Sequence, residues 1–469
     1  MLWSGIERFS TQGVSFVFTI FLTRLLTPSD YGVIAMLSIF LAVGQTFIDS
    51  GFANALIRKV NCTERDYSTA FYFNVGVGIF CYFLLFFAAP FIADFYKMPV
   101  LAPVTRVVAL SLVFNSLCIV QQAVLMTALN FKIQAKVSLV SVILSGLIGL
   151  TLAYKGFGVW ALVFQSTSNS CFRMVLLWFL ARWRPREGFS KESFRYLFSY
   201  GSKLLASGLL DTIYNNAYPL VIGKFYTPMQ LGVFARAQHF AEFPSSNITG
   251  ILKRVSFPVL SSLQEDPDRL RNGYVKFLKL SAFVIFPLML MLAALSRPFV
   301  LFLFTEKWAA AVPLLQIACL GLMWYPVHAI NLNLLQVKGR SDLFLRLEIV
   351  KKILGVAILV ATVPFGVMAM CVGLVVSSYA CLFINTYYTG DMIQLGFFKQ
   401  LKFLLPIFVN SLIMGCVVFA VSHWLPGGNL LKLVVGCFAG MAYYIGSNAF
   451  LKTEGYVEML SIVFKKHEN

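Results

Sequence analysis

The sequence predicts an all-α, polytopic membrane protein of about fourteen transmembrane helices. Of its 469 residues, 59% are hydrophobic and 12% are charged, whereas a soluble domain carries about 25% charged residues. Apolar runs of roughly 20 residues, the length that crosses a bilayer as an α-helix, recur along the whole chain. A membrane β-barrel would instead show alternating segments of about ten residues, and runs such as LLFFAAPFIA and FVIFPLMLMLAAL are continuous.

The apolar runs define the predicted spans and their orientation. The spans cover residues 8–27, 31–55, 69–92, 102–127, 134–154, 157–180, 199–223, 230–252, 276–296, 309–335, 344–363, 366–388, 400–422 and 430–450. Lys and Arg concentrate in the loops that follow the even-numbered spans and in the C-terminal tail, whereas the other loops carry isolated cations such as Lys97 and Lys155. Because cytoplasmic loops carry the excess of Lys and Arg, we expect both termini in the cytoplasm. The net charge of +18 then reflects topology, and no nucleic-acid partner is expected.

A basic segment in the middle of the chain divides the spans into two groups. Residues 182–198 belong to the stretch RWRPREGFSKESFRYLFSYG and are predicted to form an interfacial linker helix. Its apolar side chains would face lipid, and its cations would meet the headgroups of anionic membrane lipids. The apolar side chains are Phe189, Phe194, Leu197 and Phe198, and the cations are Arg186, Lys191 and Arg195. The predicted domains are an N-lobe over 1–181 with spans 1–6, a C-lobe over 199–390 with spans 7–12, and residues 391–469 with spans 13 and 14 and a cytoplasmic tail.

The two groups of spans repeat one another. The stretch LTRLLTPSDYG at 22–32 is matched 200 residues later by IGKFYTPMQLG at 222–232. Two further pairs, APFIADFY with RPFVLFLF and GFGVWALV with PFGVMAMC, share an offset of 208. Six spans are an even number, so both copies enter the membrane from the same side and form a parallel repeat of two six-helix lobes. Such lobes enclose a site near the midplane of the membrane, and spans 13 and 14 are additional.

Six stretches carry a resemblance to a known family. In chain order they are LTRLLTPSDYGVIAM, FIDSGFANALI, GFGVWALV, GKFYTPMQLGVFARAQHFAEFP, VSFPVLSSLQED and NLNLLQVKGRSDLFL. With them, essentially the whole chain resembles the Wzx-type polysaccharide and O-antigen flippases, in the polysaccharide transporter branch of the multidrug/oligosaccharidyl-lipid/polysaccharide (MOP) exporter superfamily. Members usually carry more residues before the Trp-Ser-Gly stretch at 3–5, so we expect a trimmed or mis-started N-terminus.

The resemblance implies a fold and a function. The fold is the MATE-like MOP fold, and the function is translocation of an undecaprenyl-diphosphate-linked oligosaccharide across the bacterial cytoplasmic (inner) membrane by alternating access. The cargo would be an O-antigen, capsule or exopolysaccharide repeat, as in lipopolysaccharide biosynthesis. This implies a transporter and not an enzyme, without a cofactor, and with proton or sodium coupling left open. Polymerase and chain-length components of the glycan pathway are the expected protein partners.

Such a cargo needs a hydrated cavity with cations for its diphosphate. Each sugar hydroxyl stripped of water without a partner costs roughly 2–7 kcal/mol, so ionisable residues inside spans are functional candidates. Arg24 and Lys224 hold equivalent positions in spans 1 and 7 and are predicted to bind the diphosphate, with snorkelling to headgroups as the alternative. Arg236 in span 8 is a third candidate. His239 and Glu242 share its helical face as coupling residues, unless the three form a network that only holds helices together.

Span 7 carries groups suited to sugars. Tyr214, Asn215 and Asn216 are predicted to contact the substrate, since amide and aromatic faces suit sugars. Asp211 would pair with Arg236 on the next helix or serve as a coupling site for a cation.

Two prolines and a histidine complete the predicted site. Pro219 and Pro244 free backbone carbonyls and favour kinks that would gate the cavity, although ordinary helix shaping explains them equally. His328 in span 10 is assigned to coupling, with a satisfied interhelical hydrogen-bond partner as the alternative.

Other functions remain open or are excluded by motifs. The alternatives are a MATE-type cation-coupled small-molecule antiporter, a lipid II flippase and, more distantly, a membrane-embedded glycan polymerase or ligase, which should bring a large outer loop. The sequence has no ATPase P-loop and no zinc-protease or nucleophile-elbow motif. Its nine cysteines show no metal-ligand spacing, so no metal site is expected, and Cys81, Cys118, Cys319, Cys371 and Cys416 are expected to be small buried hydrophobes.

Overall fold

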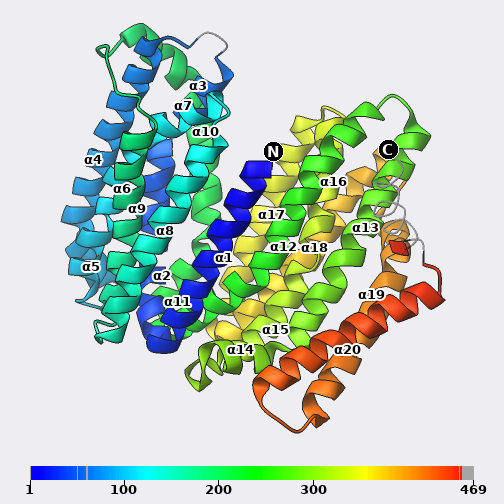
Figure 1. Cartoon of the computed structure of the whole chain (residues 1–469). Helices are drawn as coiled ribbons and strands as arrows, with labels where there is room; N and C mark the ends of the chain where they lie inside the picture. Colours follow the sequence, from blue (N-terminus) through cyan, green and yellow to red (C-terminus); the bar gives the residue numbers. More distant parts are fainter. Residues whose placement is uncertain (1, 50, 60–61, 454, 457–469) are drawn as a thin grey trace. The chain divides into compact units, whose positions relative to one another are not determined.

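The computed structural model describes residues 2–49, 51–59, 62–453 and 455–456 (Figure 1). Every regular element in these ranges is a helix. The chain forms two compact units, Met1–Gly232 (unit 1) and Val233–Asn469 (unit 2). Their boundary falls inside one helix, α12 (Pro228–Ser262). Met1, where the sequence was expected to be trimmed, lies outside the described residues.

Unit 1 is built from long helices and short ones that interrupt them. Its helices are α1 (Leu2–Leu25), α2 (Pro28–Asp49), α3 (Phe52–Arg58), α4 (Glu64–Tyr96), α5 (Leu101–Val108), α6 (Leu110–Ser116), α7 (Ile119–Thr127), α8 (Phe131–Tyr154), α9 (Val159–Leu180), α10 (Lys191–Asn215) and α11 (Ala217–Phe225). Helix α8 packs against both α1 and α9, and α10 packs against α2, α3 and α4. The helix after the basic segment therefore belongs to unit 1 by its contacts.

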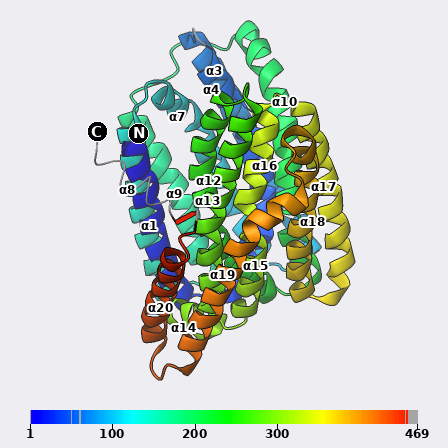
Figure 2. The same cartoon turned by 90° about the vertical axis from the view of Figure 1, so that its right-hand side faces the viewer.

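Unit 2 contains the rest of α12 and the helices that follow it. These are α13 (Pro267–Ala294), α14 (Ser296–Phe304), η1 (Glu306–Trp308), α15 (Ala311–Leu322), α16 (Tyr325–Val337), α17 (Ser341–Thr362), η2 (Val363–Phe365), α18 (Val367–Ile393), α19 (Phe397–Trp424) and α20 (Asn429–Phe450). Helices α19 and α20 lie at the edge of unit 2 in Figure 1, and α19 runs across the front of its other helices in Figure 2. Helix α20 also contacts α14.

The helix starts follow from their capping residues. At α4, the Thr63 hydroxyl accepts a hydrogen bond from the Asp66 N–H at 3.3 Å, and the Asp66 carboxylate accepts one from the Thr63 N–H at 2.9 Å. This reciprocal pair is a capping box, which satisfies two N–H groups that the helix leaves without partners. At α13, the Asp266 carboxylate accepts from the Asp268 and Arg269 N–H groups at 3.1 and 3.0 Å.

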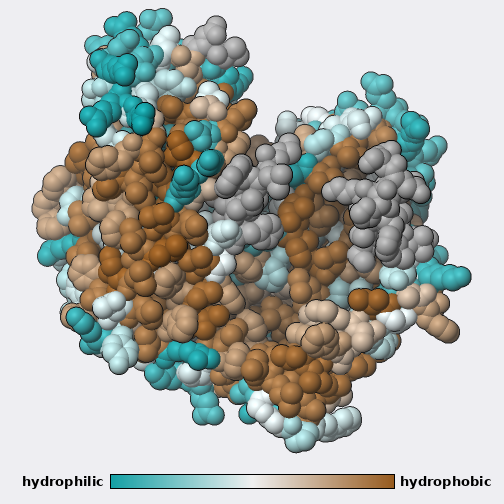
Figure 3. All heavy atoms as spheres, viewed as in Figure 1, coloured by the Kyte–Doolittle hydropathy of each residue, from teal (hydrophilic) through white to brown (hydrophobic). Residues whose placement is uncertain are grey.

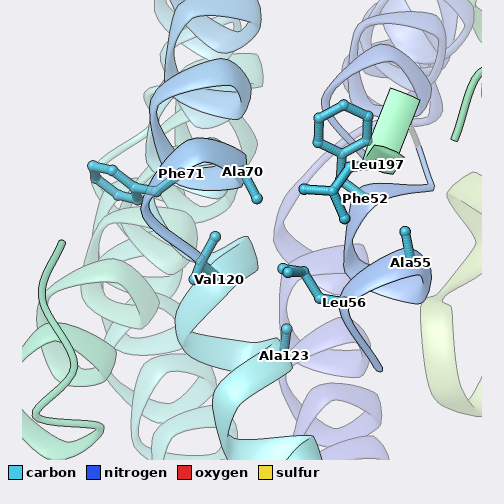
Figure 4. Packing of buried hydrophobic residues seen from close by; sticks show 8 residues of the cluster. All are labelled: Phe52, Ala55, Leu56, Ala70, Phe71, Val120, Ala123 and Leu197. Atoms are coloured by element: carbon cyan, nitrogen blue, oxygen red, sulfur yellow. The ribbon is translucent and has the colours of Figure 1, made fainter. Parts of the chain in front are cut away.

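Four helices of unit 1 share a hydrophobic cluster at one end of the unit (Figure 4). Its buried members are Phe52, Ala55, Leu56, Ala70, Phe71, Val120, Ala123 and Leu197, from α3, α4, α7 and α10. Each large side chain contributes about 1.5–3 kcal/mol when fully buried. The cluster therefore fixes the short α3 and the start of α10 to the body of unit 1.

The structure differs from the predicted linker helix over 182–198. Residues 182–190 form no helix, and Lys191 begins α10 after the Ser190 cap. Leu197 is fully buried in the cluster and the Phe194 ring packs on Phe52 and Phe73, so neither side chain faces lipid as expected. Phe189 and Phe198 are exposed, at 50% and 42%, so protein covers only part of the apolar face that was predicted to meet lipid. The predicted lobes, which were defined by the repeat and not by packing, stay a prediction.

The chain is a multi-pass membrane protein. Each of the fourteen predicted spans falls on helical segments, and nine of the described segments are long and apolar enough to cross a bilayer. Helix α17 is not among the nine, since Arg346, Glu348, Lys351 and Lys352 interrupt it, and the count of fourteen stays a prediction. Figure 3 shows hydrophobic side chains over the flanks of each unit and hydrophilic ones gathered at helix ends.

The repeat is visible in the backbone. Gly158 and Gly366, at the offset of 208, begin α9 and α18 with φ of 57° and 95°, a region that favours glycine. Lys97 and Thr305, at the same offset, end α4 and α14 with φ of 55° and 80°. Equivalent positions thus share a positive φ, which L-residues rarely adopt, although their ψ values differ, as at Lys97 (39°) and Thr305 (172°).

A buried amide pair joins α19 to the repeat helices of unit 2. The Gln400 and Asn331 side-chain amides each donate to the other's oxygen at 3.2 Å. The Gln400 amide also donates to the Thr389 hydroxyl at 3.0 Å, and the hydroxyl donates to the Asn331 oxygen at 3.3 Å. All three residues are at most 2% exposed, so the network is closed within the protein, as buried polar groups require.

Four of the five cysteines that were expected to be buried are buried. Cys81, Cys118, Cys319 and Cys371 are buried, whereas Cys416 is exposed. Cys416 lies beside the buried stripe of α19 that includes Met414, Gly415 and Val418. A single apolar run does not distinguish the two faces of such a helix, and the expectation is wrong at Cys416 for that reason.

Candidate functional site

The repeated Thr-Pro motif forms the same helix start in both copies. At α2, the Asp30 carboxylate accepts hydrogen bonds from the N–H and hydroxyl of Thr27, at 2.9 and 2.6 Å. At α12, the Gln230 side-chain oxygen accepts from the N–H and hydroxyl of Thr227, both at 3.1 Å. The proline after each threonine suits the first helical position, where its missing N–H has no partner to lose. The spacing recurs because both copies need this cap.

The glycine four residues after each proline lets the two helix starts touch. A Cβ on Gly32 would lie 1.8 Å from the Pro228 carbonyl oxygen, and a Cβ on Gly232 would lie 1.8 Å from the Pro28 carbonyl oxygen. No other residue fits either position, since glycine alone lets two backbones approach this closely. The two copies of the motif therefore pack through the same atoms in a reciprocal contact, which is the geometry of a local two-fold axis.

The two predicted diphosphate cations lie just before these contacts. Arg24 is exposed in the last turn of α1, and Lys224 is exposed in the last turn of α11. The Lys224 ammonium donates to the Phe95 carbonyl at 2.6 Å and lies 4.0 Å from the centroid of the Phe95 ring. A cation in the last turn also interacts favourably with the helix dipole. Both positions thus have a structural use, and their role toward a diphosphate stays a prediction.

Unit 1 carries an open pocket of about 550 Å³ with a mixed polar and apolar lining, here named the inner cavity. It is bounded by α2, α3, α7 and α10. Its polar lining consists of Thr46, Asp49, Asn54, Gln122, Ser207, Asp211 and Thr212, and its remaining lining of Gly51, Ala53, Ile119, Ala123, Met126, Leu204, Leu205 and Gly208. Amide, hydroxyl and carboxylate groups are the partners that sugar hydroxyls require in place of water.

Side chains around the inner cavity are linked across helices. The Thr46 and Thr212 hydroxyls lie 2.8 Å apart and join α2 to α10. The Gln45 amide donates to Asp49 at 2.9 Å, which orients one cavity carboxylate from its own helix. The Arg173 guanidinium of α9 donates to the Gln122 side chain at 3.1 Å. The lining is thus held by hydrogen bonds between neighbouring helices.

A second cavity of unit 1, of about 880 Å³, is strongly basic and is named the cationic cavity. It lies between α3 and the first turns of α10. Its lining is Arg58, Lys191, Glu192, Arg195, Tyr196, Ser199, Tyr200 and Lys203. Four cations therefore face one carboxylate, an arrangement that favours anions.

Aromatic rings position the cations of α3. The Arg58 guanidinium lies 4.9 Å from the Tyr200 ring centroid, and the Lys59 ammonium lies 5.0 Å from the Tyr196 ring centroid, both within cation–π range. Lys59 also donates to the Asp66 carboxylate at 2.6 Å, and this hydrogen bond raises the pKa of Lys59 above 10.5. The charge of Lys59 is therefore paired with Asp66, whereas the charge of Arg58 faces the cavity.

The two cavities follow one another along α10. The residues of α10 that line the cationic cavity end at Lys203, and those that line the inner cavity begin at Leu204. At 1.5 Å per residue, the stretch from Lys191 to Thr212 extends over about 30 Å, the thickness of the hydrocarbon core of a bilayer. Helix α3 follows the same order, with Arg58 in one cavity and Asn54 in the other. One polar surface thus runs from the basic end of unit 1 toward its middle.

The structure separates the predicted span 7 residues. Asp211 lines the inner cavity. Tyr214 is half-buried and Asn215 is exposed, at the end of α10. The Asn216 amide donates to the Thr212 carbonyl at 2.9 Å and occupies the break between α10 and α11. Pro219 has no N–H to donate to the carbonyl four residues earlier, and the break falls at that carbonyl. Of the predicted span 7 residues, only Asp211 lies in a cavity.

The predicted residues of α12 share one face of that helix in unit 2. Arg236, His239 and Glu242 lie away from the buried stripe of Ala237, Phe240, Ala241 and Ser245. Arg236 and His239 interact electrostatically, and Glu242 interacts with Tyr325 of α16. Helix α12 continues through Pro244 without interruption. The shared face agrees with the helical spacing, whereas the kink expected at Pro244 does not break the helix.

His328 is held between two side chains of α18. The Asn385 amide donates to Nδ1 at 3.1 Å, and Nε2 lies 3.2 Å from the Ser378 hydroxyl, which donates to the Gly321 carbonyl at 2.9 Å. A neutral ring protonated at Nε2 satisfies all three hydrogen bonds. This geometry matches the simpler of the two predicted roles, an interhelical partner, and coupling through His328 stays a prediction.

Several charged residues with a structural or cavity-lining role were not singled out from the sequence. Arg173 was missed because QSTSNSCFRM contains no acidic partner, and its partner Gln122 lies on another helix. Arg58, Lys191 and Arg195 were read as topology or headgroup signals. Lys351 was missed in α17, where it forms an ion pair with Glu348. Lys351 could have been identified from the sequence, because it is a charged residue in the middle of a predicted span.

Comparison with known proteins places the chain among polysaccharide exporters. Residues 21–313 match the family model described as "Polysaccharide biosynthesis protein". The chain is 26% identical to the lipopolysaccharide biosynthesis protein WzxC of Escherichia coli (strain K12), over 93% of this chain and 86% of that protein.

The fold also matches solved transporters. The lipid II flippase MurJ in an inward closed conformation superposes with a TM-score of 0.77 and 14% identity, covering 97% of this chain and 100% of MurJ. An inward-facing multidrug resistance MATE family transporter of the MOP superfamily gives a TM-score of 0.61 and 14% identity, covering 85% and 95% of the two chains. The predicted MATE-like helical fold is therefore confirmed.

Proposed function

The chain belongs to the family of polysaccharide biosynthesis proteins, and from that premise we propose that it flips a polyprenyl-diphosphate-linked oligosaccharide across the cytoplasmic membrane. The observation that carries the proposal is the polar surface along α10, in which a cationic cavity leads to an inner cavity of amides, hydroxyls and carboxylates. The protein acts as a transporter, since translocation needs a path and no covalent chemistry.

The chemistry of the cavities suits the two parts of such a cargo. Each sugar hydroxyl that loses water without a new partner costs roughly 2–7 kcal/mol, and an ionised diphosphate costs far more. Side chains such as Asn54, Gln122 and Thr212 offer donors and acceptors to hydroxyls. Cations offer charge-assisted hydrogen bonds to phosphate oxygens. The polyprenyl tail stays in the lipid beside the helices.

The relatives favour a glycan cargo over the alternatives. WzxC is a lipopolysaccharide biosynthesis protein and shares 26% identity with most of the chain, whereas the lipid II flippase and the multidrug transporter share 14% identity and support the fold alone. We therefore favour an O-antigen, capsule or exopolysaccharide repeat as the cargo. Both termini are proposed to be cytoplasmic, which places the cationic cavity at the cytoplasmic face. We also propose polymerases of the glycan pathway as partners and the coupling of transport to protons or sodium ions.

Reconstituted transport tests the function. Vesicles containing the purified protein and a fluorescent undecaprenyl-diphosphate-linked oligosaccharide are treated with a membrane-impermeant quencher, and the protein should make the inner-leaflet fraction accessible. A Ser207→Trp variant should block this by filling the inner cavity. Leu210→Trp is the matched control, because Leu210 is 66% exposed on the same helix and lines neither cavity. Equal quenching with and without protein would overturn the proposal.

A further inference from the structure

We propose that the cationic cavity is an entry site, which captures the diphosphate of the lipid-linked glycan in the cytoplasmic leaflet before the sugars reach the inner cavity. This inference rests on the proposed function and adds a site for its substrate. It differs from the cations predicted in the sequence, since Arg24 and Lys224 line neither cavity.

The charge of the cavity is available for a ligand. Among the described residues, Arg58, Lys191, Arg195 and Lys203 form no ion pair, and Glu192 is the one carboxylate in the lining. Arg58 is instead oriented by the Tyr200 ring. A cation held by an aromatic face keeps its donors for an anion, and a guanidinium binds phosphate oxygens in pairs. No protein carboxylate has to be displaced when an anion enters.

The cavity lies at the depth of lipid headgroups. Exposed aromatic rings flank it on the same segment, with Phe189 at 50%, Tyr196 at 53% and Phe198 at 42% exposure. Tyr, like Trp, is enriched at the boundary between hydrocarbon and water, and the Phe rings beside it can lie in the lipid at that boundary. Residues 181–190, which precede α10, lead directly into this end of unit 1. A phosphate at the membrane surface therefore meets the cavity without leaving its leaflet.

The charge and the continuation of the cavity favour a diphosphate with an attached sugar over an ordinary phospholipid. A phosphodiester headgroup carries one negative charge, whereas a diphosphate brings more charge to the four cations. A volume of about 880 Å³ accommodates more than a phosphate alone. The next residue of α10 beyond Lys203 already lines the inner cavity, whose amides and hydroxyls suit sugars. A phospholipid would leave that continuation unused.

Binding to the full-length protein in nanodiscs tests this site without requiring transport. The probes are fluorescent undecaprenyl diphosphate bearing one sugar, and undecaprenol, which lacks the diphosphate. The variant is Arg195→Gln combined with Lys203→Gln. The control is Lys97→Gln combined with Lys155→Gln, which removes the same charge at exposed residues outside both cavities. Thermal unfolding of both variants verifies folding.

The expected result is selective loss of diphosphate binding. Each lost charge-assisted hydrogen bond should weaken binding about tenfold, so the variant should bind the diphosphate probe about 100-fold more weakly. The control should bind like the wild type, and undecaprenol should bind weakly to all three. Equal binding by variant and wild type would overturn the site. Displacement of the probe by equimolar phosphatidylglycerol would also overturn it, as a general phospholipid site. Binding without flipping by the wild type would refute the transport proposal alone.

Discussion

Substitution of Gly32 by alanine perturbs the reciprocal contact between the two helix starts. The new Cβ would lie 1.8 Å from the Pro228 carbonyl oxygen, whereas real Cβ contacts are essentially never shorter than 3.0 Å. Helix α2 and the start of α12 must therefore separate locally by about 1.2 Å, the difference between 3.0 and 1.8 Å. The opposing atom belongs to the backbone, so it cannot rotate away as the end of a side chain would.

The size of the effect follows from two opposing terms. Overpacking of a well-packed site typically costs about 1–3 kcal/mol, and a rigid backbone oxygen places Gly32→Ala near about 3 kcal/mol. Alanine within a helix recovers about 1 kcal/mol relative to glycine. We therefore expect Gly32→Ala to lower the free energy of unfolding by about 2 kcal/mol. Gly232→Ala should do the same, because its Cβ would lie equally close to Pro28.

The assay is thermal unfolding of the purified protein in detergent, followed by tryptophan fluorescence. Gly76→Ala is the matched control, since a Cβ at Gly76 meets nothing within 4 Å on the long helix α4. That variant should melt higher than the wild type, by the usual gain of about 0.5–1 kcal/mol. Melting of Gly32→Ala at or above the wild-type temperature would refute the close contact and the reasoning built on it.

Three further outcomes are expected. Lys59→Met should destabilise the protein by about 3 kcal/mol, because Asp66 is buried and loses its cation. Since the pKa of Lys59 is raised in the folded state, the ion pair contributes fully below pH 10.5, and its contribution is lost as the pH rises through the folded-state pKa. A melting temperature that stays constant at high pH would contradict this. His328→Gln should keep transport and stability. His328→Leu should cost about 1–3 kcal/mol by leaving the Asn385 amide without the ring nitrogen that accepts from it, whereas Ser378 keeps its hydrogen bond to the Gly321 carbonyl. Equal melting of the two variants would contradict the hydrogen-bond assignment. Pro219→Ala restores a backbone donor, so α10 should continue into α11, with higher melting and slower quenching in vesicles; an unchanged transport rate would remove the break from the mechanism.

The sequence predicted the helices better than their interruptions. The length of an apolar run indicates the length of a span, because side chains in the hydrocarbon core must be apolar. Each predicted span coincides with helical segments. The breaks at Ala109, Cys118 and Trp324 were not predicted. No proline or glycine lies at the first two, which tertiary packing decides, whereas Pro326 in the first turn of α16 was an available signal for the third. The basic segment was misread for a similar reason, because an amphipathic pattern looks the same whether lipid or protein covers its apolar face.

The candidate site was predicted only in part. Asp211 lines a cavity, and Arg236, His239 and Glu242 share a face, because helical spacing alone fixes both results. The hydrogen bond between Arg173 and Gln122 joins residues 51 positions apart, and such pairs depend on which helices become neighbours. The cationic cavity likewise combines α3 with α10, which are distant in the sequence. Local spacing cannot report contacts of this range.

The amide network around Gln400 has a consequence for the ancestry of the chain. Helices α19 and α20 stand outside the duplicated spans, yet Gln400 closes hydrogen bonds that Asn331 and Thr389 cannot complete with each other alone. A shortened protein ending after α18 would lose the Gln400 amide and keep the hydrogen bonds from Asn331 to the Val327 carbonyl and from Thr389 to the Thr386 carbonyl, so each lost bond to Gln400 would cost about 0.5–1.5 kcal/mol. The last helix pair therefore adds hydrogen bonds to a polar pair that already has partners in its own helices, so an ancestor without α19 could have kept Asn331 and Thr389.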